Sequence, residues 1–290
     1  MTDKIDTHRR NAMIGVAAGA AGMMTLPVAA QGARESDAEQ QKPLTGKIAI
    51  VTGGSRGIGR RIAERLAQEG CRVVLVYLSN TAAANEAVAA ISQQGGVARA
   101  EKADVADEKA IAAVFQRTQQ DFGGIDFVVN AAGILPVSSI SEVSLAEADR
   151  VFQTNLWGTL VVDQQAARTV RAGGSIINIS SAITRQLVPG YGAYAASKAG
   201  VEALTVVLAR ELGGQDITVN AVAPGPTDTQ MLNQTLESSG NAEQMRQALI
   251  SAIPLGRIGR TDDIASIVLA LIGPNRWVHG QVIHTNGGIA

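Results

Sequence analysis

The sequence predicts an α/β fold in which one parallel sheet is covered by helices on both faces. Short runs that are mostly apolar alternate with longer amphipathic runs, a pattern typical of buried strands and the helices between them. Right-handed crossovers between such units give a doubly wound sheet. The chain has 290 residues, of which 46% are hydrophobic. That is enough for one sizeable core, so we expect a single domain over residues 44–290.

Seven short runs, several of them rich in β-branched residues, are expected to form the strands. They cover residues 48–52, 73–77, 97–103, 125–130, 175–179, 217–221 and 281–284. The segments between them carry apolar residues at helical spacing, as in Ile58, Ile62 and Leu66, which share one face of a helix. The expected helices cover residues 57–69, 82–94, 108–122, 145–170 and 194–212, with an interruption of the fourth near Arg150.

Residues 224–254 stand apart from this alternation. They show no clear period and are rich in polar side chains. A long irregular segment inside an otherwise regular domain is often functional. We therefore expect this segment to form a lid over a substrate site.

The first thirty residues have the composition of an export signal. Arg9 and Arg10 precede an uncharged stretch, residues 12–30, that is rich in alanine, glycine and methionine and ends in small residues. This order resembles a twin-arginine signal, although the residues after the arginines depart from its usual pattern. Residues 31–43 are polar and are expected to form a linker. We expect export to the periplasm, or a cytoplasmic location if the segment is not a functional signal.

Composition excludes several classes of function. The net charge of −1 gives no support for a nucleic-acid partner. Alanine and glycine contribute little to membrane insertion, so we expect no stable membrane span. The single cysteine, Cys71, cannot form an internal disulfide. The three histidines show no metal-ligand spacing, so no metal site is expected.

A glycine-rich turn follows the first expected strand and opens a helix. Residues 52–59 read TGGSRGIG. Glycines in this context let phosphate oxygens approach the backbone, and the start of the helix favours their negative charge. The spacing TGxxxGxG resembles the fingerprint of the classical short-chain dehydrogenase/reductase family, whose members share the Rossmann fold. The alternative is a strand-to-helix turn with no ligand.

Charge near this turn indicates which dinucleotide would bind. Sites that prefer NAD usually place an acid after the second strand, where it binds the ribose hydroxyls. Here the corresponding residues are Tyr77, Leu78, Ser79 and Asn80, none of them acidic. Arg56, inside the turn, supplies a cation for a 2′-phosphate. We therefore expect NADP(H), with NAD(H) as the alternative.

Tyr194 and Lys198 lie four residues apart in an expected helix, so both side chains share one face. A neighbouring ammonium is expected to lower the pKa of the phenol, and a phenol tuned in this way exchanges protons with a substrate oxygen. Ser181 stands thirteen residues before Tyr194. That is the family's usual separation, so Ser181 is preferred over Ser180 as the donor to a substrate carbonyl. Tyr191 is expected to border the substrate.

The family resemblance implies further roles. Asn155 would hold a water that connects Lys198 to solvent, although it could instead be an ordinary buried hydrogen-bonding residue. Asn130, Ala131 and Gly133 match the family's NNAG element, with Ala131 in place of the second asparagine. The resemblance places the cofactor on Gly53, Ser55, Arg56, Gly57, Ile58, Gly59, Tyr77, Ser79, Asp104, Val105, Asn130, Ala131, Gly133, Tyr194, Lys198, Pro224, Gly225, Thr227 and Thr229.

The resemblance extends over residues 47–290 and implies an oxidoreductase. The chain is most similar to 3-oxoacyl-[acyl-carrier-protein] reductases and related ketoreductases, which implies reduction of a ketone or 3-oxoacyl carbonyl with Tyr194 as the acid. An alcohol or sugar dehydrogenase working in the oxidising direction is one alternative. A cofactor-binding scaffold or sensor without turnover is another. The family also implies a homotetramer formed through the helices that begin near Arg150 and Tyr194.

Overall fold

The computed structural model describes residues 42–238 and 240–290, and its centre is a parallel sheet. Seven strands lie in the order β3-β2-β1-β4-β5-β6-β7. They are β1 (Ile48–Thr52), β2 (Arg72–Tyr77), β3 (Val97–Lys102), β4 (Ile125–Asn130), β5 (Val170–Ile179), β6 (Thr218–Pro224) and β7 (Val282–Thr285). Every neighbouring pair is parallel, so the predicted doubly wound fold is confirmed. The expected export signal and all but the last two residues of the expected linker lie outside the described residues.

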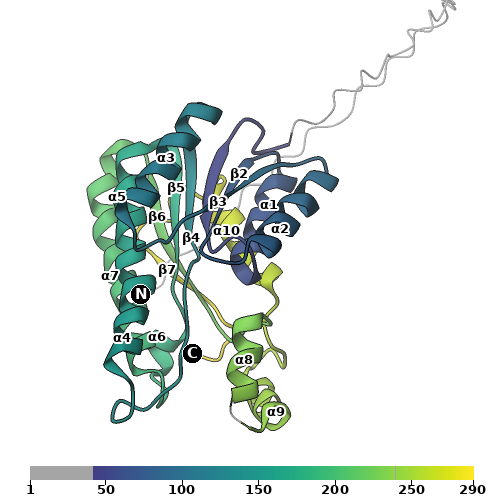
Figure 1. Ribbon diagram of the computed structural model, residues 1–290, viewed down its shortest axis with the longest axis vertical. Helices are drawn as coiled ribbons and strands as arrows, with labels where there is room; N and C mark the ends of the chain where they lie inside the picture. The colour runs from purple at the N-terminus through teal and green to yellow at the C-terminus, as the bar shows by residue number, and fades with distance from the viewer. Residues whose placement is uncertain (1–41, 239) are drawn as a thin grey trace, which may run out of the picture. The chain divides into compact units, whose positions relative to one another are not determined.

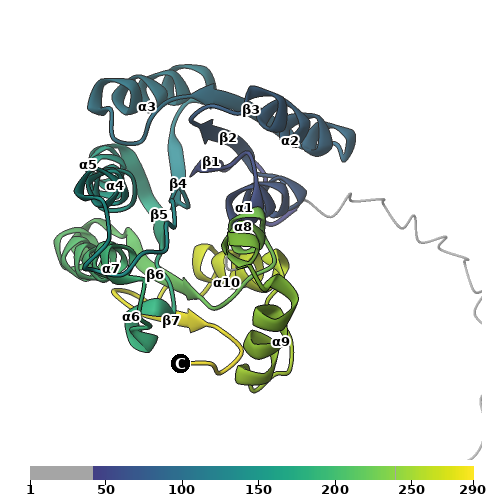
Figure 2. The same ribbon diagram turned by 60° about the horizontal axis from the view of Figure 1, so that its bottom comes forward.

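Helices cover both faces of the sheet (Figure 2). One face carries α1 (Gly57–Gln68), α2 (Thr81–Gln93) and α10 (Thr261–Ile272). The other carries α3 (Glu108–Phe122), α5 (Gly158–Thr169) and α7 (Gly192–Leu212). Short helices α4 (Leu145–Val151) and α6 (Ile183–Gln186) precede α5 and α7. The helices α8 (Gln230–Ser238) and α9 (Ala242–Ala252) lie beyond the end of the sheet (Figure 1).

Two apolar clusters explain why the central strands are apolar throughout. Alternate residues of a strand point to opposite faces, so Val51 packs towards α1 and α10 while its neighbour Ile50 packs towards α3 and α5. Both side chains are fully buried. A strand between two such layers needs apolar residues at every position.

The long helix expected over residues 145–170 is interrupted two residues after Arg150, close to the expected position, by a π-helical segment, Phe152–Trp157. Two other segments differ from the sequence-based expectations. The expected irregular lid contains the two helices α8 and α9, whose mostly exposed surfaces explain why their polar residues masked the helical period. Helix α10 was not expected, and its buried Ile264 and Val268 complete the core beside α1.

The order of the strands determines where a ligand can bind. The chain enters the sheet at β1, moves outward to β3 and returns to β4 on the other side of β1. Crossovers on opposite faces leave a crevice at the carboxyl ends of β1 and β4. Thr52 and Asn130 face each other there in register. Within the described residues, no helix is both long and apolar enough to cross a bilayer, and no side-chain cluster suited to a metal ion is present.

Candidate active site

A cavity of about 980 Å³ opens at the carboxyl ends of the strands. Its walls come from the turn after β1, the loops after β4, β5 and β6, the start of α7, and the helices α8 and α9. The cavity is therefore assembled from segments that are far apart in the sequence.

The turn after β1 can be built only from glycine at two positions. Gly53 has φ +63°, and a Cβ there would lie 2.9 Å from the backbone of Ala131 and Ala132. A Cβ on Gly59 would lie 2.5 Å from the carbonyl oxygen of Gly53. The Thr52 hydroxyl accepts hydrogen bonds from the amides of Ala131 and Ala132, at 3.1 and 3.2 Å. The turn and the loop after β4 are thus held together as one backbone cradle at the start of α1.

The end of the cavity beside β2 fits a nucleotide with a 2′-phosphate. Arg56 lines it and donates to Oε1 of Gln230, 3.0 Å away on α8. Tyr77 and Ser79 line the same end, and no residue from Tyr77 to Asn80 is acidic. Arg56 is therefore a cation beside a backbone cradle, and no carboxylate after β2 repels a phosphate there.

Asp104 and Val105 border the cavity where β3 ends. Oδ1 of Asp104 accepts from the amide of Ala106, 3.0 Å away, which forms a local turn. The N-terminal cap of α3 is instead Asp107, whose Oδ1 accepts from two amides. Asp104 is consequently not used as a helix cap and can face a ligand.

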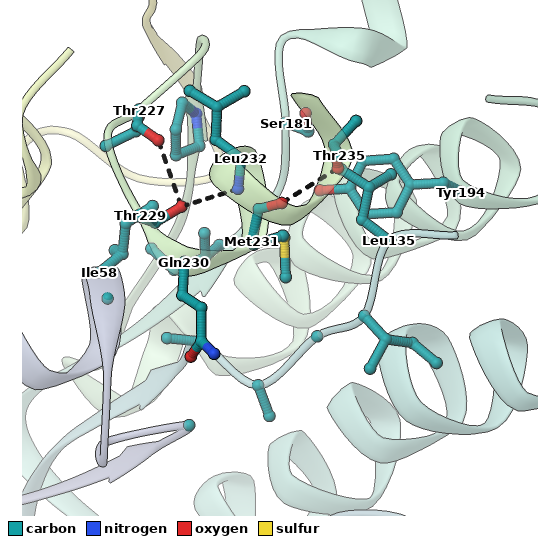
Figure 3. A pocket seen from close by; sticks show the side chains of 18 of the residues that line it. Ile58, Leu135, Ser181, Tyr194, Thr227, Thr229, Gln230, Met231, Leu232 and Thr235 are labelled. Atoms are coloured by element: carbon teal, nitrogen blue, oxygen red, sulfur yellow. Dashed lines mark hydrogen bonds between the residues drawn. The ribbon is translucent and has the colours of Figure 1, made fainter. Parts of the chain in front are cut away.

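Ser181, Tyr194 and Lys198 meet at the opposite end of the cavity. Ser181 follows β5, whereas Tyr194 and Lys198 lie on successive turns of α7. The Ser181 side chain acts to lower the pKa of Tyr194, and both side chains line the cavity together with Met231 and Thr235 of α8 (Figure 3). Tyr191, which forms the start of α7, also lines the cavity.

Lys198 was expected to lower the pKa of Tyr194, but in the structure this pKa is raised. Burial raises the pKa of Tyr194 to about 12, and only the hydrogen bond with Ser181 acts in the opposite direction to a significant degree. The reason is that Nζ of Lys198 donates to the carbonyl oxygen of Ile179, 2.7 Å away, and lies 5.9 Å from the centre of the tyrosine ring. Burial also lowers the pKa of Lys198 to about 8. Tyr194 is therefore fully protonated at neutral pH.

Asn155 lies behind the cavity wall rather than in it. The π-helical segment presents its side chain to the loop after β4, where Oδ1 accepts from the amide of Ile134 (2.9 Å) and Nδ2 donates to its carbonyl (3.0 Å). Nδ2 also lies 3.2 Å from Oγ of Ser197 on α7. Asn155 thus ties the loop to the helix that carries Tyr194 and Lys198.

Asn130 does not line the cavity and supports the central sheet instead. Its Nδ2 donates to Asp163 of α5 (2.8 Å) and to Asn178 of β5 (2.9 Å). Burial raises the pKa of Asp163 to about 7, against the hydrogen bonds from these two asparagines. Asn130 faces the helices behind the sheet, and its role is to join β4 to β5.

The loop after β6 contributes Pro224, Gly225, Thr227 and Thr229 to the cavity. The Thr227 hydroxyl donates to the carbonyl of Gly225 (2.9 Å), and that of Thr229 donates to the carbonyl of Thr227 (3.2 Å). The amide of Leu232 donates to Oγ1 of Thr229, 3.3 Å away (Figure 3). These bonds connect the loop directly to the start of α8.

All the expected site residues apart from Asn130 and Asn155 line the cavity. Sequence reasoning missed the side chains that α8 and α9 direct into it, among them Met231, Leu232 and Leu249. The spacing of Met231, Leu232 and Leu236 is helical and could have indicated α8. It could not have indicated the direction in which α8 lies.

The chain is similar in sequence and structure to several known proteins. The sequence profile of the enoyl-(acyl carrier protein) reductase family matches residues 53–290. A short-chain type dehydrogenase/reductase of Picea abies is 42% identical over 256 residues, covering 84% of this chain and 93% of that protein. An NADPH-dependent aldehyde reductase-like protein of Arabidopsis thaliana chloroplasts is 38% identical over 261 residues, covering 85% and 95%. The crystal structure of a short-chain dehydrogenase from Burkholderia cenocepacia J2315 in complex with NADP has 37% identity and a TM-score of 0.78, covering 85% of this chain and 99% of that chain.

Proposed function

The chain belongs to the classical short-chain dehydrogenase/reductase family, and we propose that it uses NADP(H) to reduce the carbonyl group of a small molecule to an alcohol. The observation that carries this proposal is that Ser181, Tyr194 and Lys198 line the same cavity as the glycine turn. Arg56 beside that turn, with no acid after β2, favours NADP(H) over NAD(H). A relative described as NADPH-dependent and a related structure that contains NADP support the same cofactor.

The site residues have distinct roles in this reduction. When bound, NADP(H) supplies a hydride to the carbonyl carbon. The Ser181 hydroxyl donates a hydrogen bond to the carbonyl oxygen and positions it. Tyr194 gives its proton to the same oxygen as negative charge develops there. Lys198 places a positive charge nearby, and Asn155 holds the loop after β4 against α7. One hydride and one proton convert the carbonyl to the alcohol.

The raised pKa of Tyr194 keeps the phenol in the protonated form that reduction requires. At neutral pH the phenol holds its proton and is ready to donate it, whereas oxidation of an alcohol would require the phenolate. Within this reaction we propose ketones and 3-oxoacyl carbonyls as the groups that are reduced. The competing proposals are an alcohol or sugar dehydrogenase and a cofactor-binding scaffold. The complete set of Ser181, Tyr194 and Lys198 in one cavity weighs against the scaffold.

The proposal is tested by the loss of NADPH absorbance when purified protein is mixed with a panel of aldehydes and ketones. We expect turnover by the wild-type protein and none above background by Tyr194→Phe, which lacks the proton to be transferred. Binding of NADPH should be similar in both proteins. NADPH binding without turnover of any carbonyl would leave the scaffold, and unchanged activity of Tyr194→Phe would refute the role of Tyr194.

Two further features belong to the proposal. A homotetramer would form through the π-helical segment Phe152–Trp157, α5 and α7, whose exposed apolar side chains include Trp157, Leu160 and Val207. Residues 1–30 would direct export through the twin-arginine route, which is supported by Arg9, Arg10 and the uncharged stretch after them. N-terminal sequencing of the protein from its native cell tests the export proposal. An uncleaved chain found only in the cytoplasm would contradict it.

A further inference from the structure

The part of the cavity beyond Ser181 and Tyr194 has mostly apolar walls. The loop after β4 contributes Leu135, and the segment before α7 contributes Val188 and Tyr191. Opposite them lie Met231 of α8, Leu249 of α9 and, near the C-terminus, Ile289. In Figure 3, Met231 and Leu135 border the space into which Tyr194 and Ser181 point. A substrate with its carbonyl at Tyr194 places the rest of its body against these side chains.

Cations are scarce around this space. Among the described residues that line the cavity, the positively charged side chains are Arg56 and Lys198. Arg56 lies at the glycine turn and donates to Gln230. Lys198 is buried behind Tyr194 and donates to Ile179. Neither is placed to pair with an anionic group on the body of a substrate.

The acidic residues that line the cavity strengthen this effect. They are Asp104 at the end of β3 and Glu147 on α4. An unpaired carboxylate or phosphate that leaves water for an apolar wall loses its hydration without a compensating partner. The negative charge of Glu147 adds repulsion rather than attraction.

Taken together, we propose that the substrate is an uncharged carbonyl compound with an apolar body, and that the cavity rejects substrates carrying a carboxylate or phosphate on that body. This rests on the proposed carbonyl reduction and adds to it the charge of the accepted molecules. The selectivity comes from the absence of a cation rather than from a specific contact with the correct substrate.

A matched pair of aldehydes tests this inference. Methyl 4-formylbenzoate and 4-formylbenzoate share a ring and a carbonyl group and differ in one charge. We expect kcat/KM with NADPH to be at least about tenfold higher for the ester, which corresponds to a difference of roughly 1.4 kcal/mol. Equal values, or a preference for the acid, would overturn the inference while leaving carbonyl reduction in place.

Calorimetry separates the inference from the proposed reaction. Protein saturated with NADP⁺ is titrated with the two corresponding alcohols, methyl 4-(hydroxymethyl)benzoate and 4-(hydroxymethyl)benzoate. Tighter binding of the ester supports the inference even if neither aldehyde is turned over, an outcome that would refute the reductase instead. Equal binding of both alcohols, or binding of neither, would overturn the inference.

Met231 allows a gain-of-function test. Met231→Arg introduces a cation at the apolar wall and should reduce the preference for the ester several-fold, whereas Met231→Leu should keep it. Both substitutions are at a partly exposed position of α8. An unchanged ratio in Met231→Arg would overturn the statement that a missing cation causes the selectivity.

A second inference rests on Glu202, a carboxylate of α7 that the reaction itself does not use. Its Oε1 accepts a hydrogen bond from Oγ of Ser180, 2.7 Å away. The Thr184 hydroxyl lies 2.9 Å from the same Oε1 and 3.0 Å from the carbonyl oxygen of Ser181. Glu202 therefore holds the chain on both sides of Ser181 against the helix that carries Tyr194.

The contacts of Glu202 with Ser180 and Thr184 hold the backbone on both sides of Ser181. Oγ of Ser181 accepts from the amide of Ile183, 3.3 Å away. We infer that Glu202 is a positioning residue, which sets the distance between Ser181 and Tyr194 through Ser180 and Thr184. Small misplacement of a reacting group costs rate rather than substrate binding.

The test compares Glu202→Ala with Glu202→Gln. Glutamine keeps an oxygen acceptor at the same place, so it should retain kcat to within about threefold. Alanine removes it and should lower kcat by about tenfold or more, with little change in KM or in NADPH affinity. Wild-type kcat in Glu202→Ala, or equal losses in both variants, would overturn the inference.

Thr184→Val provides an independent measurement if Glu202→Ala folds poorly. This substitution removes the Thr184 hydroxyl and its contact with Glu202, and it leaves the carboxylate of Glu202 in place. A fall in kcat at unchanged KM supports the positioning role, and wild-type kcat contradicts it. Wild-type turnover is measured alongside. If the wild-type protein reduces no carbonyl compound, the proposed function is refuted, and not the positioning role of Glu202.

Discussion

Lys198 is the group of the site that titrates closest to physiological pH. Burial disfavours its ammonium and lowers its pKa to about 8, whereas burial disfavours the phenolate of Tyr194 and raises that pKa to about 12. Burial therefore moves the pKa values of Tyr194 and Lys198 in opposite directions. Tyr194 remains a proton donor over the range in which Lys198 loses its charge.

This arrangement predicts how reduction depends on pH. Below about pH 8 Lys198 is charged and stabilises the negative charge that develops near Tyr194. Above it the lysine becomes neutral, so kcat for reduction should be level near pH 6–7 and fall as pH rises through about 8. Steady-state kinetics with saturating NADPH measure this. A profile that stays level to about pH 10 would show that the charge of Lys198 does not govern the rate.

Arg56 is predicted to decide between the two nicotinamide cofactors. Arg56→Ala removes the cation at the glycine turn, so affinity for NADPH should fall by about tenfold or more while affinity for NADH changes little. Fluorescence titration with each cofactor measures both constants. Arg60→Ala is the matched control, because Arg60 lies in the first turn of α1, four residues after Arg56, and pairs with Glu64. Equal losses for NADPH and NADH in Arg56→Ala would refute the assignment.

The turn between β1 and α1 shows how an element depends on close backbone approach. Gly53 combines a positive φ with a Cβ position only 2.9 Å from the neighbouring backbone. Gly95 also has a positive φ, +75°, but nothing lies within 4 Å of its Cβ position. A side chain at Gly95 would therefore meet only backbone strain, whereas a side chain at Gly53 would also collide with the neighbouring backbone.

Alanine at these two positions should have different consequences. Gly95→Ala carries only the strain of the left-handed conformation and should cost about 1–2 kcal/mol of unfolding free energy. Gly53→Ala must also displace the loop after β4, so it should cost more and abolish NADPH binding. Chemical denaturation and cofactor titration measure the two effects. Equal destabilisation with cofactor binding intact would contradict this account.

Helices α8 and α9 illustrate what a sequence pattern leaves undecided. A functional segment was expected between residues 224 and 254, and this region does line the cavity. Its helices were missed because most of their residues are exposed, with Leu236 the buried residue of α8 and none buried in α9. An amphipathic period is weak when little of a helix enters the core.

Assembly of several copies would involve surfaces that the isolated chain leaves exposed. The proposed tetramer buries Val207 of α7, which is 52% exposed. Val207→Glu should therefore lower the molar mass measured by light scattering, because a charge would be placed in an apolar interface. Val97→Glu is the matched control, since Val97 is 51% exposed on the edge strand β3. An unchanged tetramer in Val207→Glu would exclude α7 as the interface.

The amino-acid sequence alone was sufficient for the fold class and for the place of the glycine turn, because both depend on local period and short spacing. The choice of Ser181 rested on the resemblance to a known family, and Ser181, Tyr194 and Lys198 all line the cavity. The contacts of Asn130 and the missed α10 depend instead on which face of the sheet a residue meets. Only the tertiary structure decided that Lys198 donates to Ile179 and that burial raises the pKa of Tyr194. Desolvation and the directions of hydrogen bonds arise from packing among segments distant in sequence, so they become defined only when the sheet and its helices are assembled.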